Sequence, residues 1–472
     1  MQNDPTEGTG SALLTDGVQE LVALLGPENL RHGTEIDLES VNDWSGETGG
    51  LPVAWVAPRS TEELSEIMKI CTRHRLPIVP QGGLSGLAGG ATPSDGCVLI
   101  SLARLAGIEE IDTASSLMIV RAGTPLQTVQ EAAAQAGLFF ALDLGARGSC
   151  QIGGAISTNA GGNRVIRYGM MRDLVLGLEV VLMDGTILSM MNRMPKNNAA
   201  MDLKHLFIGG EGTTGIITRA VLKLHPHVGG ANAALIAVSD FDTALALLRF
   251  VQRGLSGRTT AFELMWNDYY TAATTHEGIR APLSAGYPIY ALIEMQGADP
   301  DADRPAFEDM LEQALDNGLI LDAVIAQNER EVDSFWALRD SISELLIAFK
   351  PKISFDVSVP LARLGDCVEV MRARLDAAFP GLPQLYFGHA GDSNLHLVTG
   401  LMDQYGAEEH AVEQIVYDIT RDFNGSISAE HGIGLHKKRW LSYCRSEVEL
   451  TLLRNVKALF DPMGLLNPHK VI

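Results

Sequence analysis

The sequence has few cysteines and no long apolar run. Its five cysteines are scattered along the chain and none forms a Cys-X-X-Cys pair. This pattern favours reduced thiols and gives no support for an iron–sulfur cluster. No apolar stretch reaches the roughly 18 uninterrupted residues that a membrane-spanning helix needs. The sequence therefore predicts a protein that does not span a membrane.

Positive charge is also scarce. Lys and Arg number 36 against 58 Asp and Glu, which gives a formal net charge of −22. Such a chain repels a phosphate backbone, so nucleic acid is excluded as a partner, and any anion must be bound by local groups. The start, MQNDPTEGTG, has neither the basic and apolar segments of a secretory signal nor the arginines of a transit peptide. We therefore expect a cytoplasmic location.

At 472 residues the chain exceeds the size of one hydrophobic core, so two or three packed units are expected. Val53–Val56 reads as a strand, and Ser60 with Glu63 matches a capping box for a helix that begins at Thr61. From about Ala231 onward, strand-like runs alternate with helical stretches, which is typical of the α+β class. The predicted strands are AALIAVS, TAFELMW, YPIYALIEM, LDAVIA and ISFDVSV, and the acidic GADPDADRP is expected to be a turn or loop.

One glycine motif is misleading. Gly210, Gly212 and Gly215 satisfy the G-X-G-X-X-G pattern of a dinucleotide-binding Rossmann turn. That pattern is meaningful only when it opens a helix, whereas the following IITRAVLKL alternates as a strand does. We therefore reject a Rossmann fold here. The chain also lacks G-X-X-X-X-G-K-[S/T], which excludes a P-loop.

Three separated glycine clusters are the most unusual feature. They are PQGGLSGLAGG (80–90), DLGARGSCQIGGAISTNAGGNRVIRYG (143–169) and IGGEGTTGII (208–217). Backbone amides in such loops, with the hydroxyls of Ser85, Ser149, Ser157 and Thr158, can neutralise a pyrophosphate without a lysine. Each cluster alone could be an ordinary turn. The three together favour a cradle for a cofactor pyrophosphate.

These clusters, with LGLEVVLMDGTIL, GHAGDSNLH, SAEHGIG and LLNPHK in the same order, resemble one family over nearly the whole chain. The sequence is similar to the FAD-linked oxidoreductases of the vanillyl-alcohol-oxidase (PCMH-type) superfamily, in the D-lactate and D-2-hydroxyglutarate dehydrogenase branch. The resemblance implies a PCMH-type FAD-binding domain at residues 1–228, an α+β substrate-binding cap at 229–425, and a helical C-terminal segment, 426–472, that returns to the FAD domain.

The resemblance also implies which residues bind FAD, and because no histidine lies in the first two glycine clusters we expect no covalent bond to it. They are Gly82, Gly83, Leu84, Ser85, Gly86, Leu87, Ser149, Ile152, Gly153, Gly154, Ser157, Thr158 and Gly162, with Glu211, Ile216, Ile217 and Asn467 near the adenine or flavin. One departure is Gly210, where relatives usually carry serine.

His389 and His396 stand seven residues apart in a glycine-containing segment that suits neither a helix nor a straight strand, so we expect a bent loop. Glu430 with His431 follows later. The resemblance implies that His389, His396 and Glu430 hold a divalent metal, with zinc favoured and manganese or iron as alternatives. It further implies that His431 is the base that takes the hydroxyl proton, the alternative being a third nitrogen ligand.

Substrate residues follow from the same resemblance. Arg339 would hold the substrate carboxylate, the alternative being a surface cation on a helix. Asn394 would contact substrate or only shape its loop, and Ser343 keeps the hydroxyl of a family threonine. At Ser354 the chain departs from the family, because relatives have a lysine there and the nearest lysines here are Lys350 and Lys352.

The expected activity is therefore oxidation of a D-2-hydroxy acid, such as 2-hydroxyglutarate, lactate or malate, to the 2-oxo acid. The resemblance implies that hydride passes to the flavin and electrons then pass to an electron-transfer flavoprotein or similar acceptor, and a homodimer is expected. Two alternatives remain open. One is a flavin-carrying subunit of a glycolate-oxidase-like complex, and the other is a non-redox flavoprotein on the same scaffold.

Overall fold

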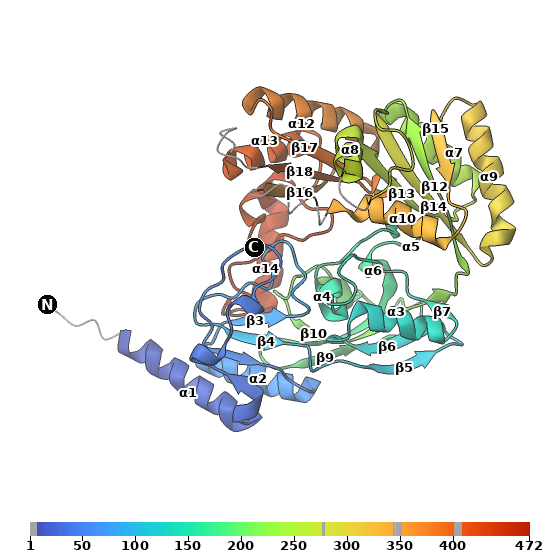
Figure 1. Cartoon of the computed structure of the whole chain (residues 1–472). Helices are drawn as coiled ribbons and strands as arrows, with labels where there is room; N and C mark the ends of the chain where they lie inside the picture. Colours follow the sequence, from blue (N-terminus) through green and yellow to red (C-terminus); the bar gives the residue numbers. More distant parts are fainter. Residues whose placement is uncertain (1–6, 276–278, 343–344, 346–351, 401–407) are drawn as a thin grey trace. The chain divides into compact units, whose positions relative to one another are not determined.

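The computed structural model describes residues 7–275, 279–342, 345, 352–400 and 408–472 (Figure 1). The chain divides into two compact units. The first comprises Met1–Gly161, Met170–Pro226 and Glu430–Ile472, and the second comprises Gly162–Gly169 and His227–Ala429. Both contain helices and sheets, which confirms the predicted α+β class. The second glycine cluster is thus split, with Gly162 in the second unit.

In the first unit a four-stranded sheet has the order β1-β2-β4-β3, with β2, β4 and β3 parallel. Ser60 caps α2 by accepting the N–H of Glu63, as predicted, although the Glu63 carboxylate bonds the N–H of Arg59 rather than that of Ser60. The elements are α1 (Glu7–Leu25), β1 (Leu30–Arg31), β2 (Ala54–Val56), α2 (Thr61–His74), β3 (Ile78–Gln81) and β4 (Val98–Ser101).

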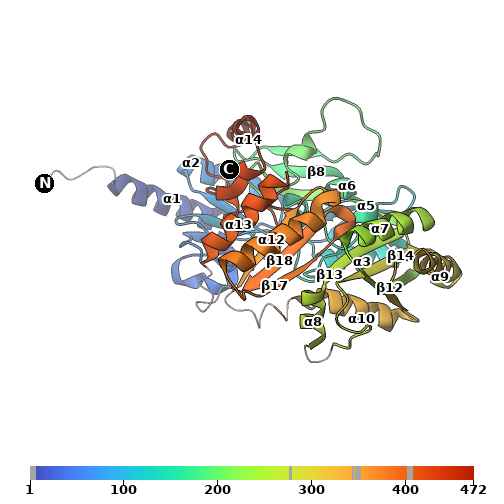
Figure 2. The same ribbon diagram turned by 90° about the horizontal axis from the view of Figure 1, so that it is seen from above.

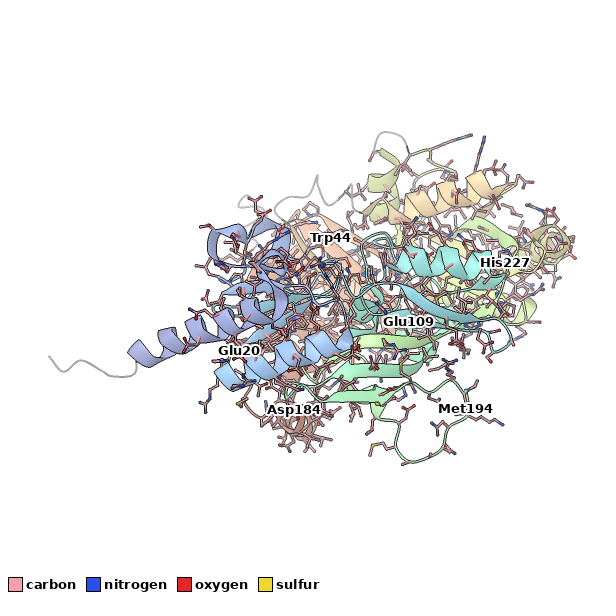
Figure 3. The ribbon with its side chains drawn as sticks, turned by 90° about the horizontal axis from the view of Figure 1, so that it is seen from below. Glu20, Trp44, Glu109, Asp184, Met194 and His227 are labelled. Atoms are coloured by element: carbon pink, nitrogen blue, oxygen red, sulfur yellow. The ribbon has the colours of Figure 1, made fainter. Side chains whose placement is uncertain are left out.

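A second, antiparallel sheet of the first unit has the order β5-β6-β10-β8-β9. Asp184 lies at the turn of the β8–β9 hairpin (Figure 3). β10 follows Gly215 directly, which confirms that this glycine motif opens a strand and no Rossmann helix. The elements are β5 (Ile108–Asp112), β6 (Leu117–Arg121), α3 (Leu126–Gln135), β7 (Leu138–Phe139), α4 (Ile152–Ser157), α6 (Met171–Leu174), β8 (Val175–Val181), β9 (Ile187–Met190), β10 (Ile216–Lys223), β11 (His225–Pro226) and α14 (Glu447–Phe460).

The second unit is built on a seven-stranded antiparallel sheet of order β15-β12-β14-β13-β17-β18-β16. All five strands predicted for this region are confirmed: β12 (Gly230–Val238), β13 (Thr259–Trp266), β14 (Ile289–Gly297), β15 (Asp322–Ile325) and β16 (Lys352–Ser358). β17 (Gln384–Gly388) and β18 (Asn394–Gly400) complete the sheet.

Helices lie on both faces of this sheet. α8 (Asn267–Thr275) and α10 (Glu329–Asp340) cover one face through a buried cluster that includes Tyr269 and Leu338. α7 (Phe241–Gly254), α9 (Pro300–Asp316), α12 (Leu364–Ala378) and α13 (Glu409–Asp422) lie on the other face (Figure 2). Phe355 on β16 contacts Tyr417 of α13 at 5.5 Å between ring centroids. The short α5 (Val165–Tyr168) packs against β13.

The prediction of a loop at GADPDADRP is wrong, because α9 begins there. The side chain of Asp299 accepts the N–H groups of Asp301 and Ala302, and Pro300 occupies the first helical position, where a missing N–H costs nothing. In the described segments no helix is both long and apolar enough to cross a membrane.

Candidate active site

The first two glycine clusters meet in the first unit. Residues 82–87 follow β3, and a Cβ atom on Gly83 would lie 1.8 Å from the carbonyl oxygen of Ser149. Only glycine allows that approach. Nothing lies within 4 Å of a Cβ on Gly154, and Gly86 and Ser149 are exposed, so backbone groups of both loops face open space. This fits a cradle in which backbone amides reach a ligand.

The third cluster joins the same assembly. The N–H of Glu211 donates to the carbonyl of Ser157 at 2.8 Å, and the N–H of Gly209 donates to that of Ile156 at 3.1 Å. The structure therefore brings the three clusters together, apart from residues 162–169. Three apolar residues predicted near the cofactor, Ile152, Ile216 and Ile217, are almost fully buried, so their side chains belong to the core.

Glu211 and Asn467 tie the C-terminal segment to these loops. The buried carboxylate of Glu211 accepts the N–H groups of Ile433 and Gly434 at 2.7 and 2.8 Å, yet burial raises its pKa. The amide of Asn467 donates to the carbonyls of Gly90 and Glu211 at 3.0 and 2.8 Å. Both side chains thus hold the C-terminal segment against the glycine loops of the predicted cradle.

In the second unit Arg339 is buried, so the alternative of a surface cation is wrong. It lies on α10, as predicted, and its Nε donates to Oε2 of Glu263 on β13 at 2.8 Å. The other oxygen of Glu263 lies 2.8 Å from Nδ1 of His389, and Nη2 of Arg339 lies 3.3 Å from Nε2 of the same ring. Burial raises the pKa of Glu263, but the charges of His389 and Arg339 outweigh burial and lower it overall.

The segment HAGDSNLH contains the turn of the β17–β18 hairpin and the start of β18, so the prediction of a bent loop is wrong for His396. His389 directly follows β17, and His396 lies on β18 opposite Phe387. The left-handed backbone of Ser393, with φ of 75°, ends the turn and lets the strand begin at Asn394. The sequence pattern did not reveal the hairpin, because β18, a strand of seven residues, starts inside the motif.

The hairpin brings the two histidines together. Their ring centroids are 5.4 Å apart, and a nitrogen of one lies within 4.8 Å of a nitrogen of the other. Each has its own buried carboxylate: Glu263 for His389, and Asp356 for His396 at 3.9 Å. Histidines that bind metals usually bond a carboxylate through their second nitrogen, so this pair fits a metal site.

Glu263 and Asp356 were missed by sequence reasoning. Both stand as single acids in apolar strands, TAFELMW and ISFDVSV, and are almost fully buried. Because a charge is buried only when it is paired, an isolated acid in such a strand signals a partner across the fold. That signal was available in the sequence.

The chain passes from the second unit to the first between Ala429 and Glu430. The N–H of Ala429 donates to Oδ2 of Asp356 at 3.2 Å within the second unit. Glu430 and His431 are the next two residues, and Ile433 then bonds Glu211 in the first unit. Glu430 and His431 thus lie in the short stretch between the bond of Ala429 to Asp356 and the bond of Ile433 to Glu211.

The residues predicted to contact the substrate take separate positions along the second unit. Asn394 is buried at the start of β18, and neither atom of its amide has a hydrogen-bond partner within the described segments. Ser354 is exposed on β16, two residues from Asp356 and therefore on the same face of the sheet. Lys352, two residues before Ser354 in β16, lies on that face as well. Ser343 and Lys350 lie outside the described residues.

Comparisons with known proteins identify the family. Residues 52–190 match the FAD binding domain and residues 230–471 match the C-terminal domain of FAD linked oxidases. The chain belongs to the FAD-linked oxidases. A relative in Oryza sativa subsp. indica, "Probable D-2-hydroxyglutarate dehydrogenase, mitochondrial", is 38% identical over 98% of this chain and 82% of its own length. D-2-hydroxyglutarate dehydrogenase of Xanthomonas citri pv. viticola is 37% identical over 94% of both chains.

The fold has solved neighbours as well. The structure of p-cresol methylhydroxylase superposes with a TM-score of 0.77 at 15% identity, covering 98% of this chain and 97% of that one. The predicted family branch, the PCMH-type fold and the assignment as an FAD-dependent oxidoreductase are therefore confirmed. The predicted cytoplasmic location is wrong, because relatives from rice, Arabidopsis thaliana and Bos taurus are named mitochondrial.

Proposed function

We propose that this flavoenzyme oxidises a D-2-hydroxy acid to the 2-oxo acid with the help of a divalent metal. The observation that carries the proposal is the buried pair His389 and His396, each beside its own carboxylate, in a chain of the FAD-linked oxidases. Relatives at 37–38% identity are named D-2-hydroxyglutarate dehydrogenases, which supports this substrate class.

The first unit would hold FAD. Residues 82–87, Ser149, Gly153, Gly154, Ser157 and Thr158 would surround its pyrophosphate. Because the N–H groups of Ser149, Gly153 and Thr158 already donate to carbonyls of the chain, the backbone amides of residues 82–87 are the ones that would reach it. Bound FAD supplies an acceptor for the hydride that leaves C2 of the substrate. The glycine contacts fix the shape of the cradle, and Glu211 and Asn467 hold the C-terminal segment against it.

His389, His396 and Glu430 would hold the metal, with zinc favoured because two imidazoles and one carboxylate are a common ligand set of catalytic zinc. His389 would use Nε2, since Nδ1 faces Glu263 at 2.8 Å. A bound divalent cation supplies an electrophile that makes a hydroxyl proton easier to remove at neutral pH.

Three side chains would act on the substrate. The hydrogen bond from Nε of Arg339 to Glu263 orients the guanidinium so that Nη2 lies beside His389. The Nη groups would bind the substrate carboxylate. Asn394 offers a buried amide without a protein partner among the described residues, which a substrate oxygen would satisfy. His431, two residues after Ala429, is the base that takes the hydroxyl proton as C2 is oxidised.

Ser354 is the position that would select which chemical group the substrate carries at its distal end. It lies exposed on the face of β16 that carries Asp356, and it has no charge. A second carboxylate, as in 2-hydroxyglutarate, would find no cation at this position, and Lys352 is the next lysine along the same face. D-Lactate, which has no second carboxylate, is therefore a candidate substrate, and D-malate and D-2-hydroxyglutarate are the dicarboxylates to compare with it. We further propose an electron-transfer flavoprotein or similar acceptor, and a homodimer.

Steady-state reduction of an artificial electron acceptor with D and L forms of these acids tests the proposed activity. We expect one D-acid to give turnover and stoichiometric 2-oxo acid, while its L form gives none. Flavin-containing protein that turns over no 2-hydroxy acid would contradict the proposal and favour the alternative of a flavin-carrying subunit.

A further inference from the structure

Asp356 occupies an unusual place in the second unit. It lies in the middle of β16, at the edge of the seven-stranded sheet, and is completely buried. Its neighbours Phe355 and Val357 point to the opposite face, and His396 is its direct partner across the strands. The edge position leaves one side of β16 available to another segment.

That segment is residues 426–429. Ser358 and Ser426 exchange two backbone hydrogen bonds, at 3.0 and 2.7 Å, and the N–H of Ala429 lies 3.3 Å from the backbone oxygen of Asp356. These backbone bonds attach the segment to the sheet edge whatever side chain stands at position 356. An apolar side chain would therefore be sufficient for the fold there.

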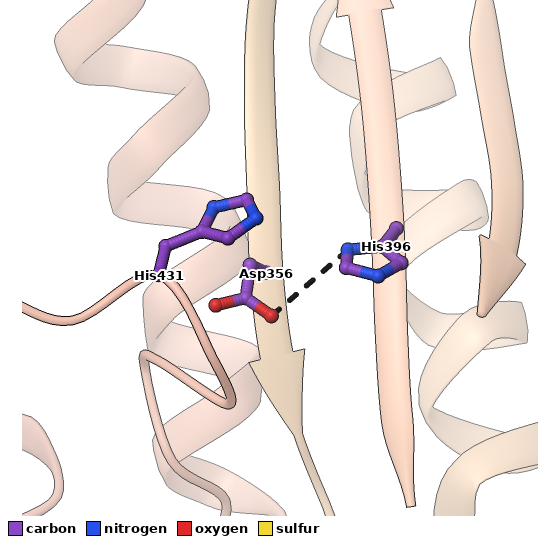
Figure 4. Close-up of side chains that lie close together, drawn as sticks. All are labelled: Asp356, His396 and His431. Carbon is purple, nitrogen blue, oxygen red and sulfur yellow. Dashed lines mark ion pairs between the residues drawn. The ribbon is translucent and has the colours of Figure 1, made fainter. Parts of the chain in front are cut away.

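The Asp356 carboxylate instead contacts two elements that lead to predicted metal ligands. Oδ2 accepts the N–H of Ala429 at 3.2 Å and the hydroxyl of Ser428 at 3.4 Å, next to Glu430 in the chain. Oδ1 lies 3.9 Å from Nδ1 of His396, and this ion pair is drawn in Figure 4. One carboxylate thus faces one ligand and the backbone that precedes another.

Burying a carboxylate is costly unless its partners compensate, so its presence here requires a function that a hydrophobic residue cannot supply. From these contacts we infer that Asp356 is a positioning residue, which orients His396 and sets the backbone before Glu430 so that both ligands face one divalent cation. The inference rests on the proposed metal site.

Asp356→Asn is the informative variant. The single amide oxygen of the asparagine, in the place of Oδ2 of Asp356, still accepts the N–H of Ala429. The neutral amide no longer attracts His396. Asp376→Asn is the control for the same substitution at an exposed site, because Asp376 lies on α12 on the other face and accepts a hydrogen bond from Gln384 at 2.7 Å. Asp356→Ser, which also removes the charge and keeps a polar group, provides a second variant if Asp356→Asn does not fold.

The experiment is a zinc titration of chelator-treated protein in competition with a fluorescent zinc indicator, with melting temperatures of the metal-free proteins as a check of folding. We expect Asp356→Asn to bind zinc about 10- to 100-fold more weakly than wild type, while the metal-free proteins melt alike and Asp376→Asn binds like wild type. Equal zinc affinity of Asp356→Asn and wild type would overturn the role of Asp356 alone. Wild-type protein that binds no divalent metal would contradict the proposed function as well.

Discussion

Arg339 and Glu263 form an ion pair that solvent does not reach. Nε of Arg339 lies 2.8 Å from Oε2 of Glu263, and the two side chains are 5% and 1% exposed. The pair joins α10 to β13 and also presents Oε1 to His389. Stability and the candidate site therefore depend on the same carboxylate.

Glu263→Gln should destabilise the second unit by about 3–5 kcal/mol, because it removes the buried counterion of Arg339 and leaves that charge only the partly exposed Asp340, at 3.5 Å. Urea denaturation measures the change. Glu308→Gln is the control, since Glu308 forms an exposed pair with Arg304 on α9 and should cost less than about 1 kcal/mol. Equal midpoints for the two variants would show that the buried pair adds nothing to stability.

Gly83→Ala should disrupt the cradle, since its new methyl group would stand 1.8 Å from the Ser149 carbonyl and force the two loops apart. We expect a cost of roughly 1–3 kcal/mol and FAD binding about tenfold weaker or worse. Gly145→Ala, where a Cβ meets nothing within 4 Å, should keep its flavin. Flavin retention on gel filtration compares them, and full retention by Gly83→Ala would contradict the contact.

Much of this architecture was predictable from the sequence. Local signals were sufficient for β2, for the Ser60 cap and for the alternation after Gly215, because each depends on neighbouring residues. The start of α9 was missed since Asp299 and Pro300 suit a turn and a helix start equally. The single acids Glu263 and Asp356 in apolar strands signalled buried partners, but no local pattern identifies those partners, His389 and His396, because they are distant in the chain.

Asn394→Ala should separate stability from activity. Because the buried amide has no protein partner in the described segments, its removal should leave the melting temperature almost unchanged. A substrate contact would be lost, so kcat/KM for the preferred 2-hydroxy acid should fall about 10- to 100-fold. A clear loss of stability with unchanged kcat/KM would instead assign Asn394 to shaping its turn.

Lys470 should make stability depend on pH in the alkaline range. Burial lowers its pKa to about 8 from an ordinary value of 10.5. Between these values the unfolded chain binds a proton that the folded chain does not, so stability should rise with pH by as much as about 3 kcal/mol. Melting curves of wild type and Lys470→Met from pH 8 to 10.5 isolate this contribution. Parallel pH profiles would contradict it.

Ser354→Lys should shift specificity toward a dicarboxylate, because it places a cation on the face of β16 that carries Asp356. We expect the ratio of kcat/KM for D-2-hydroxyglutarate to that for D-lactate to rise about tenfold. Ser354→Ala controls for loss of the hydroxyl. An unchanged ratio in the lysine variant would show that this position does not face the distal end of the substrate.

The most direct test of the account is anaerobic loss of the visible flavin absorbance on mixing with a D-2-hydroxy acid, before and after a chelator removes metal. We expect rapid bleaching by one D-acid, its loss after chelation, and its recovery with zinc or manganese. Bleaching that survives complete removal of metal would contradict the role of His389, His396 and Glu430, and a flavin that no 2-hydroxy acid bleaches would contradict the proposed reaction.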